Sequence, residues 1–198
     1  MRSYTAAGAP GRCPRCLLLL DYCLCQEIGE ARPNRPEILI VRHHWEAWKS
    51  TGTARLAALA LSNARILDMA AEDPEPVRAE LERLAGAWLL YPGRETQARL
   101  AEPPQTLIVL DGTWRQTQKM LRRLPQLSRL PRLGLESPPR RPRLRTPPRA
   151  VARSTLESIA DALGLLDSPA LGQHLLALHD RFVQQTLRAR GAAPSPSG

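Results

Sequence analysis

The sequence lacks any long apolar run. No stretch approaches the roughly 18 apolar residues that a membrane-spanning helix requires, and the N-terminal segment MRSYTAAGAPGRCPRC has no apolar core of the signal-peptide kind. We therefore expect a soluble, cytoplasmic protein with no membrane partner. The GxGxxG and Walker motifs are also missing. Their absence removes support for a standard dinucleotide-binding fold and for a nucleotide hydrolase.

Lysine is scarce. Lys49 and Lys119 are the only two lysines, although lysine and arginine together number 28. Aspartate and glutamate number 19, so the net charge is +9. Arginine binds phosphate through paired hydrogen bonds and stacks on bases, so this excess indicates a nucleic acid as partner. A GC-rich genome would favour arginine over lysine but would not explain the excess of positive charge.

Cysteine is confined to one short segment. The segment CPRCLLLLDYCLC has the spacing C-x2-C-x6-C-x-C. In a cytosolic chain this clustering predicts a metal site rather than disulfides. Four thiolates fill the tetrahedral shell of Zn²⁺, so we predict a structural zinc site, with free or redox-active thiols as the alternative. The predicted ligands are Cys13, Cys16, Cys23 and Cys25.

The 198 residues suffice for one domain of ordinary size with a small appendage. We predict a disordered N-terminus over residues 1–11, a zinc-binding knuckle over 12–32, a main domain over 33–190 and a disordered tail over 191–198. In the main domain short buried strands alternate with amphipathic helices, which predicts an α/β fold with a mostly parallel sheet and flanking helices.

The predicted elements follow from the period of the apolar residues. Strands are expected at 37–41, 65–67, 87–93, 106–111 and 133–136. Helices are expected in the second half of 42–61, within 72–84, from 114 onward, over 154–166 and over about 171–188. The segment SPPRRPRLRTPPRAVAR is too rich in proline to form a helix.

The stretch LIVLDGTWRQTQKML joins a strand to a helix within four residues. The apolar run 107–110 is typical of a strand covered on both faces, and the helical period that follows places Trp114 and Met120 on the inner face. The junction then lies at the carboxyl end of a central strand, where open α/β sheets bind ligands. A plain helix start, with Asp111 or Thr113 as the N-cap and Trp114 as packing, is the alternative.

Four segments in order carry a resemblance: HHWEAWKSTGTARLAAL, LLYPG, LDGTW and RTPPRAVARSTLESIADAL. Behind the cysteine knuckle they resemble the DTW-domain family of tRNA-uridine aminocarboxypropyltransferases. The namesake Asp-x-Thr-Trp motif stands at 111–114 and Leu-Tyr-Pro at 90–92. The resemblance covers about residues 13–187. The other matching positions are His43, Glu46, Lys49, Ser50, Thr53, Arg55, Leu56, Arg145, Ser154, Thr155 and Glu157.

The resemblance implies a SPOUT-like α/β fold with a C-terminal trefoil knot. It also implies a transferase that uses S-adenosylmethionine, moves the 3-amino-3-carboxypropyl group to N3 of a tRNA uridine and releases methylthioadenosine. No obligatory protein partner is implied. His44 and Gly52 depart from the family's Pro and Asn, so the RNA position or substrate is left open. A SPOUT-type RNA methyltransferase and a non-catalytic zinc-containing RNA-binding protein remain as alternatives.

We assign roles to the matching residues as hypotheses. The catalytic set is Asp111, Thr113 and Trp114, with Asp111 as general base or as the carboxylate that orients the uridine, and with Trp114 packing the site wall or, alternatively, stacking on a base. Ser154 and Glu157 also form a capping box, which explains them equally well. The cofactor-binding residues are Leu90, Tyr91, Pro92, Gly93, Asp111, Gly112, Thr113, Ser154, Thr155 and Glu157. The RNA-binding residues are His43, Glu46, Thr53, Arg55, Arg140, Arg141, Arg143 and Arg145.

Overall fold

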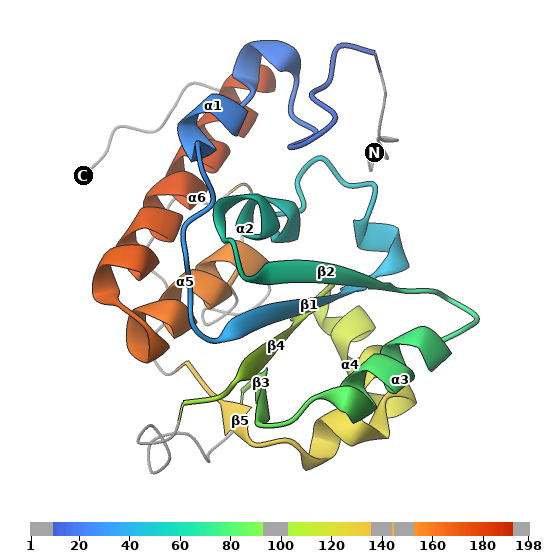
Figure 1. Ribbon diagram of the computed structural model, residues 1–198. Helices are drawn as coiled ribbons and strands as arrows, with labels where there is room; N and C mark the ends of the chain where they lie inside the picture. Colours follow the sequence, from blue (N-terminus) through green and yellow to red (C-terminus); the bar gives the residue numbers. More distant parts are fainter. Residues whose placement is uncertain (1–9, 93–102, 136–143, 145–152, 192–198) are drawn as a thin grey trace.

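The computed structural model describes residues 10–92, 103–135, 144 and 153–191 (Figure 1). Its sheet has five parallel strands in the order β2-β1-β4-β3-β5. The prediction of an α/β fold with a parallel sheet and flanking helices is confirmed, whereas the trefoil knot and the SPOUT-like assignment stay predictions. The strands are β1 (Glu37–His43), β2 (Ala64–Met69), β3 (Ala87–Leu90), β4 (Thr106–Asp111) and β5 (Arg132–Leu133).

The helices cover both faces of the sheet, with α2, α5 and α6 on one face and α3 and α4 on the other (Figure 1). The helices in the first half of the chain are η1 (Leu20–Tyr22), α1 (Cys25–Ile28), η2 (His44–Glu46), α2 (Ala54–Ala60) and α3 (Glu75–Arg83). The later ones are α4 (Trp114–Arg123), η4 (Pro125–Arg129), α5 (Thr155–Leu166) and α6 (Pro169–Ala189). The predicted disordered segments at the two ends of the chain lie almost entirely outside the described residues.

The sheet separates two apolar cores. Leu39 and Ile108 pack with α3, α4 and η4 on one face, whereas Ile40 and Leu107 pack with α2, α5 and α6 on the other. Both central strands are therefore buried on both faces, as their uninterrupted apolar runs predicted. The cysteine segment joins the second core through side chains that include Leu24.

The strand predicted at 133–136 is shorter than expected. Only Arg132 and Leu133 pair with the sheet, opposite Leu89 and Leu90. Because β3 ends at Leu90, residues beyond Leu133 have no strand to pair with. The last predicted residue of this strand, position 136, lies outside the described residues.

Helices α5 and α6 approach closely at two glycines. A Cβ added to Gly172 would lie 2.8 Å from the Ala160 carbonyl oxygen and 2.9 Å from the Gly164 Cα atom. A Cβ added to Gly164 would meet nothing nearer than 3.9 Å. The backbones therefore pack against each other on the Gly172 side, with room left on the Gly164 side.

Gly172→Ala is expected to lower the free energy of unfolding by about 1–3 kcal/mol, because the added methyl group forces the helices apart. Gly164→Ala is the matched control. It is expected to be neutral or stabilising by up to about 1 kcal/mol, since Ala is the better helix former. Urea unfolding of both variants measures the difference, and equal stabilities would contradict the close approach.

Candidate functional site

The site lies at the carboxyl edge of the sheet, where β1 and β4 end side by side. Arg42 near the end of β1 is in register with Asp111, the last residue of β4. Beyond the strand ends, the Gln116 Nε2 atom lies 3.4 Å from the His43 Nδ1 atom. The loop after β1 and the first turn of α4, far apart in the sequence, are thus in contact.

Helix α4 begins with a capping box. The Thr113 hydroxyl accepts a hydrogen bond from the Gln116 amide at 3.3 Å, and the Thr113 amide donates to the Gln116 Oε1 atom at 2.6 Å. Thr113 is therefore the N-cap, and Asp111 does not cap the helix. Gly112 fits closely here, since an added Cβ would lie 3.1 Å from the Gln116 Cβ.

Asp111 is left available for another role. Its side chain is buried, with 6% of the residue exposed, and the Thr155 hydroxyl donates a hydrogen bond to its Oδ1 atom at 2.5 Å. The Oδ2 atom is also buried and has no hydrogen-bond partner among the described residues. At the end of a central strand, the carboxylate therefore has one oxygen that accepts a hydrogen bond and one buried oxygen without a hydrogen-bond partner among the described residues.

The environment raises the pKa of Asp111 to about 6. Burial is the main cause, because it disfavours the charged form, and the nearby Glu46 carboxylate adds to it. The Thr155 hydrogen bond and the positive charges of Arg42 and Lys49 act in the opposite direction. Asp111 thus titrates close to neutral pH, where a general base is most effective.

Helix α5 closes the site through its first turn. Thr155 contacts Asp111, and the Leu156 amide donates a hydrogen bond to the Thr53 hydroxyl at 3.2 Å. Thr53 is buried at the start of α2. Three predicted segments, which precede α2, α4 and α5, therefore converge on the same point.

The remaining predicted residues of the first motif surround this point. Glu46 pairs with Lys49, and both side chains are largely buried. The Arg55 guanidinium donates to the Ala47 carbonyl oxygen at 2.8 Å. His43 is buried, and burial together with the neighbouring His44 lowers its pKa, so the imidazole is neutral near pH 7.

Trp114 is not packed in the core, so its predicted inward position is wrong. The residue is 45% exposed, and its ring stacks on Tyr91 with centroids 5.7 Å apart and planes 15° apart. As the first residue of α4 it projects past the sheet edge, and burial begins with Thr117 and Met120. Arg132 lies 5.5 Å from the centre of the Tyr91 ring.

The sequence did not indicate that Arg132 and Gln118 would lie beside Tyr91. The Gln118 side chain donates a hydrogen bond to the Tyr91 hydroxyl. Arg132 adjoined a predicted strand beginning at Leu133, but its place beside Tyr91 follows from the pairing of β5 with β3. No local pattern indicates that pairing.

The Ser154 capping box is present, with the Glu157 carboxylate accepting from the Ser154 amide at 2.7 Å. Glu157 is 2% exposed and lies 3.6 Å from the His179 Nε2 atom. The cofactor contacts assigned to Leu90, Pro92 and these α5 residues stay predictions. Gly93, Arg140, Arg141, Arg143 and Arg145 lie outside the described residues.

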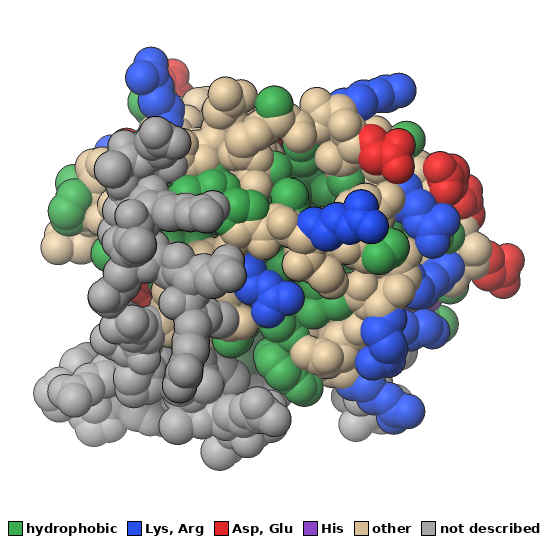
Figure 2. All heavy atoms as spheres, turned by 90° about the horizontal axis from the view of Figure 1, so that it is seen from below, with side chains coloured by type: hydrophobic (Ala, Val, Ile, Leu, Met, Phe, Trp, Pro, Cys, Tyr) green, Lys and Arg blue, Asp and Glu red, His purple; other side chains and the backbone are tan. Residues whose placement is uncertain are grey.

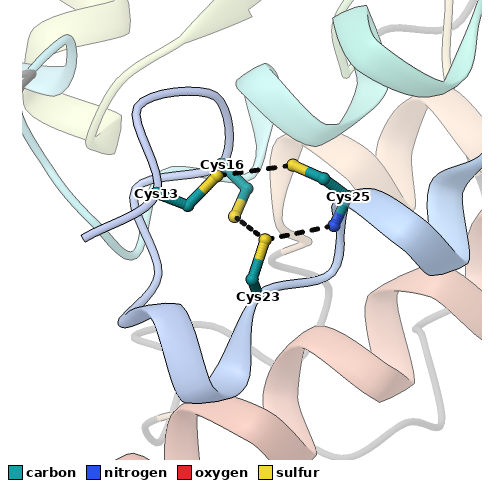
Figure 3. A group of neighbouring side chains, drawn as sticks. All are labelled: Cys13, Cys16, Cys23 and Cys25. Carbon is teal, nitrogen blue, oxygen red and sulfur yellow. Dashed lines mark hydrogen bonds between the residues drawn. The ribbon is translucent and has the colours of Figure 1, made fainter. Parts of the chain in front are cut away.

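The four cysteines gather into a second candidate site, as predicted (Figure 3). Their sulfur atoms all lie within 4.8 Å of one another. Cys13 and Cys25 are 3.6 Å apart at sulfur, and Cys16 and Cys23 are 3.7 Å apart. A tetrahedron with Zn–S bonds of about 2.3 Å has its sulfurs about 3.8 Å apart, so the arrangement is able to hold zinc.

The fold is that of an α/β protein with a cluster of buried polar side chains at the carboxyl edge of a parallel sheet and four cysteines placed so that they could hold a metal ion. The chain belongs to the DTW domain family, whose model matches residues 11–187. It is 30% identical over 190 residues to tRNA-uridine aminocarboxypropyltransferase 2 of Drosophila melanogaster, across 86% of this chain and 74% of the relative. No solved structure matches the chain. Among the described residues, no helix is long and apolar enough to cross a membrane.

Proposed function

We propose that the protein transfers the 3-amino-3-carboxypropyl group of S-adenosylmethionine to N3 of a uridine in tRNA. The similarity to a named tRNA-uridine aminocarboxypropyltransferase supports the reaction and the RNA class. The observation that carries the proposal is the buried Asp111 carboxylate, which has one oxygen without a hydrogen-bond partner among the described residues and a pKa near 6. Such a group suits removal of a proton from an imide nitrogen.

The reaction forms one bond and breaks one bond. The uridine N3 lone pair forms a bond to the γ-carbon of the donor, the bond from that carbon to sulfur breaks, and its electron pair stays on the sulfur of methylthioadenosine. The N3 proton passes to the Oδ2 atom of Asp111. Bound S-adenosylmethionine supplies a carbon already activated by its sulfonium, so the protein chiefly positions the reactants.

The surrounding residues serve this proton transfer. Thr155 holds the Oδ1 atom and so fixes the direction in which Oδ2 points. Burial and the nearby Glu46 carboxylate raise the pKa of Asp111, which suits it to accept a proton near neutral pH. The uridine must be unpaired, since N3 lies on the pairing edge, and RNA loops present such bases.

We also propose that the cysteine cluster binds one structural Zn²⁺. Cys13, Cys16, Cys23 and Cys25 supply four thiolates, so no position is open for a substrate or for water. The role of the ion is to hold the segment against the core, where Leu17 and Leu24 are fully buried.

Incubation of the protein with tRNA and S-adenosylmethionine, labelled in the aminocarboxypropyl chain, tests the function. The expected result is label in a uridine nucleoside by mass spectrometry and stoichiometric release of methylthioadenosine. Release of S-adenosylhomocysteine with a methylated nucleoside would replace the proposal by methyl transfer. Absence of cofactor binding in calorimetry would leave only an RNA-binding role.

A further inference from the structure

Three of the protein's four tryptophans are about half exposed, and all three follow the carboxyl ends of adjacent strands. The exposed fractions are 52% for Trp45, 48% for Trp48 and 45% for Trp114, against 7% for Trp88. Trp45 and Trp48 come after β1, and Trp114 comes directly after β4. Exposed indole surface is unfavourable in water, so its concentration at one edge indicates a binding surface.

Helix α4 adds positive charge beside Trp114. Arg115, Lys119 and Arg122 are exposed and occur at positions i, i+4 and i+7, so they share one face of the helix. Within the described part of the chain these three side chains form no ion pair, and α4 contains no Asp or Glu. Like charges at this spacing destabilise a helix slightly, so the fold itself does not explain them. We call these three residues the α4 stripe.

The stripe and the catalytic carboxylate are close. Trp114 is three residues from Asp111, and the charge of Lys119 is near enough to His43 to lower the pKa of its imidazole. Seen from below, the molecule shows several Lys and Arg side chains on the part where α3 and α4 lie, with a few Asp and Glu side chains among them at its edge (Figure 2). A bound chain of negative charge along α4 would therefore lead to the site.

We propose that Trp114 and the α4 stripe bind the single-stranded RNA next to the modified nucleotide, with an unpaired base stacked on Trp114 and the flanking phosphates against the stripe. This rests on the proposed function for the identity of the RNA as tRNA. Indole and base surfaces stack favourably whatever the base, and cations along the backbone add salt-sensitive affinity. Tyr91 supports the inner side of Trp114 by stacking on it.

RNA fits these features better than a lipid surface does. An interfacial helix presents a continuous apolar face with cations along its border. The exposed side of α4 is polar instead, and its one large apolar side chain, Trp114, lies at the first position beside Thr113 and Gln116. An aromatic ring among hydrogen-bonding groups is typical of base recognition.

The first experiment measures the charge contribution. Anisotropy of labelled oligouridylate, in the absence of S-adenosylmethionine, gives the affinity of wild type and of R115Q/K119Q/R122Q over a range of salt concentrations. Loss of three phosphate contacts is expected to reduce the slope of log affinity against log salt by about 2. The matched control R32Q/R35Q/R83Q removes three exposed charges that precede β1 and β3, at the opposite edge of the sheet, and is expected to retain the wild-type slope.

The second experiment measures stacking. Trp114→Leu is expected to weaken binding to oligouridylate by roughly 5- to 150-fold, since a stacked base contributes about 1–3 kcal/mol. Binding to the same strand paired with oligoadenylate should be unchanged, and Trp114→Phe should retain most of the affinity. Unchanged melting temperatures show that these surface variants are folded.

The outcomes separate this inference from the proposed function. Equal loss in the stripe variant and its control, or equal effects of Trp114→Leu on single and paired strands, would overturn the RNA surface even if wild type transfers the group to tRNA. The inference would also be overturned if the stripe variant or Trp114→Leu lost binding to anionic vesicles but bound RNA as wild type does. Conversely, the expected RNA results with no release of methylthioadenosine would support the surface and reject the transferase.

Discussion

Replacement of Asp111 by Asn is expected to lower the rate of product formation by about 100- to 10,000-fold, which is the usual contribution of a general base. The protein is expected to stay folded. The amide keeps the shape of the side chain, and its oxygen still accepts the Thr155 hydrogen bond. It has no basic oxygen for the N3 proton. Single-turnover release of methylthioadenosine measures the loss, with binding of S-adenosylmethionine measured separately by calorimetry.

Asp68→Asn is the matched control for this loss. Asp68 lies near the end of β2 at the same edge of the sheet, but its side chain is 49% exposed and is bound by Arg42. Its amide is expected to leave activity within a few-fold of wild type. Unchanged turnover in the Asp111 variant would remove this carboxylate from the chemistry.

The pH profile tests the same assignment. Because Asp111 has a pKa of about 6, the single-turnover rate is expected to rise tenfold per pH unit below that value and to level off above it. The Asn variant should lack this inflection, since the titrating group has been removed. A wild-type rate that is flat between pH 5 and 7 would contradict a base role.

The buried carboxylate also has an effect on stability. Its folded pKa of about 6 exceeds the ordinary value of 3.8, so the folded state binds the proton more tightly than the unfolded state does. Stability is then highest when Asp111 is protonated in both states, and it falls as pH rises from about 4 to about 6. The shift of about two pKa units corresponds to up to about 3 kcal/mol.

Asp111→Asn removes this pH-dependent loss. We therefore compare the melting temperature of the variant minus that of wild type at two pH values. This difference is expected to be roughly 5–10 °C larger at pH 7 than at pH 4. Calorimetric scans of both proteins at the two pH values give the comparison, and any zinc lost at low pH is lost by both proteins. A difference that does not change with pH would show that the carboxylate is not destabilised by burial.

The elements of the fold with strong local patterns were predictable from the sequence. The apolar runs of β1 and β4 require cover on both faces, and the capping boxes at Thr113 and Ser154 mark helix starts by side-chain chemistry alone. Since parallel strands end at a common edge, the segments that follow β1 and β4 lie close together, and His43 contacts Gln116 there.

The contacts that give the site its properties were not predictable in this way. The hydrogen bond from Thr155 to Asp111 joins residues 44 positions apart and depends on how α5 docks. The raised pKa of Asp111 likewise depends on burial, which composition does not reveal. Trp114 followed the helical period of an inward residue, yet its place at the first turn leaves it beyond the sheet, stacked on Tyr91.

Loss of the cysteine segment is expected to lower stability strongly, because apolar side chains of this segment are part of the second core, on the α2, α5 and α6 face of the sheet. Leu17, Leu18, Leu24 and Ile28 are at most 4% exposed, although the segment contains only the short helices η1 and α1. Without a bound ion, the sulfur atoms that join these short elements are linked only by weak S–H hydrogen bonds. Partial release of the segment would expose part of the surface of four large apolar side chains, each of which contributes about 1.5–3 kcal/mol when fully buried.

Cys16→Ser is therefore expected to abolish stoichiometric zinc binding and to lower the melting temperature by roughly 10–20 °C, which corresponds to about 5 kcal/mol for a domain of this size. Wild type treated with a strong zinc chelator should melt like the variant, and added Zn²⁺ should restore only wild type. Leu20→Ser is the control, since Leu20 lies in the same segment, is 59% exposed and is not a ligand. If metal-free wild type and Cys16→Ser both melt at the temperature of untreated wild type, the four thiols hold no structural ion.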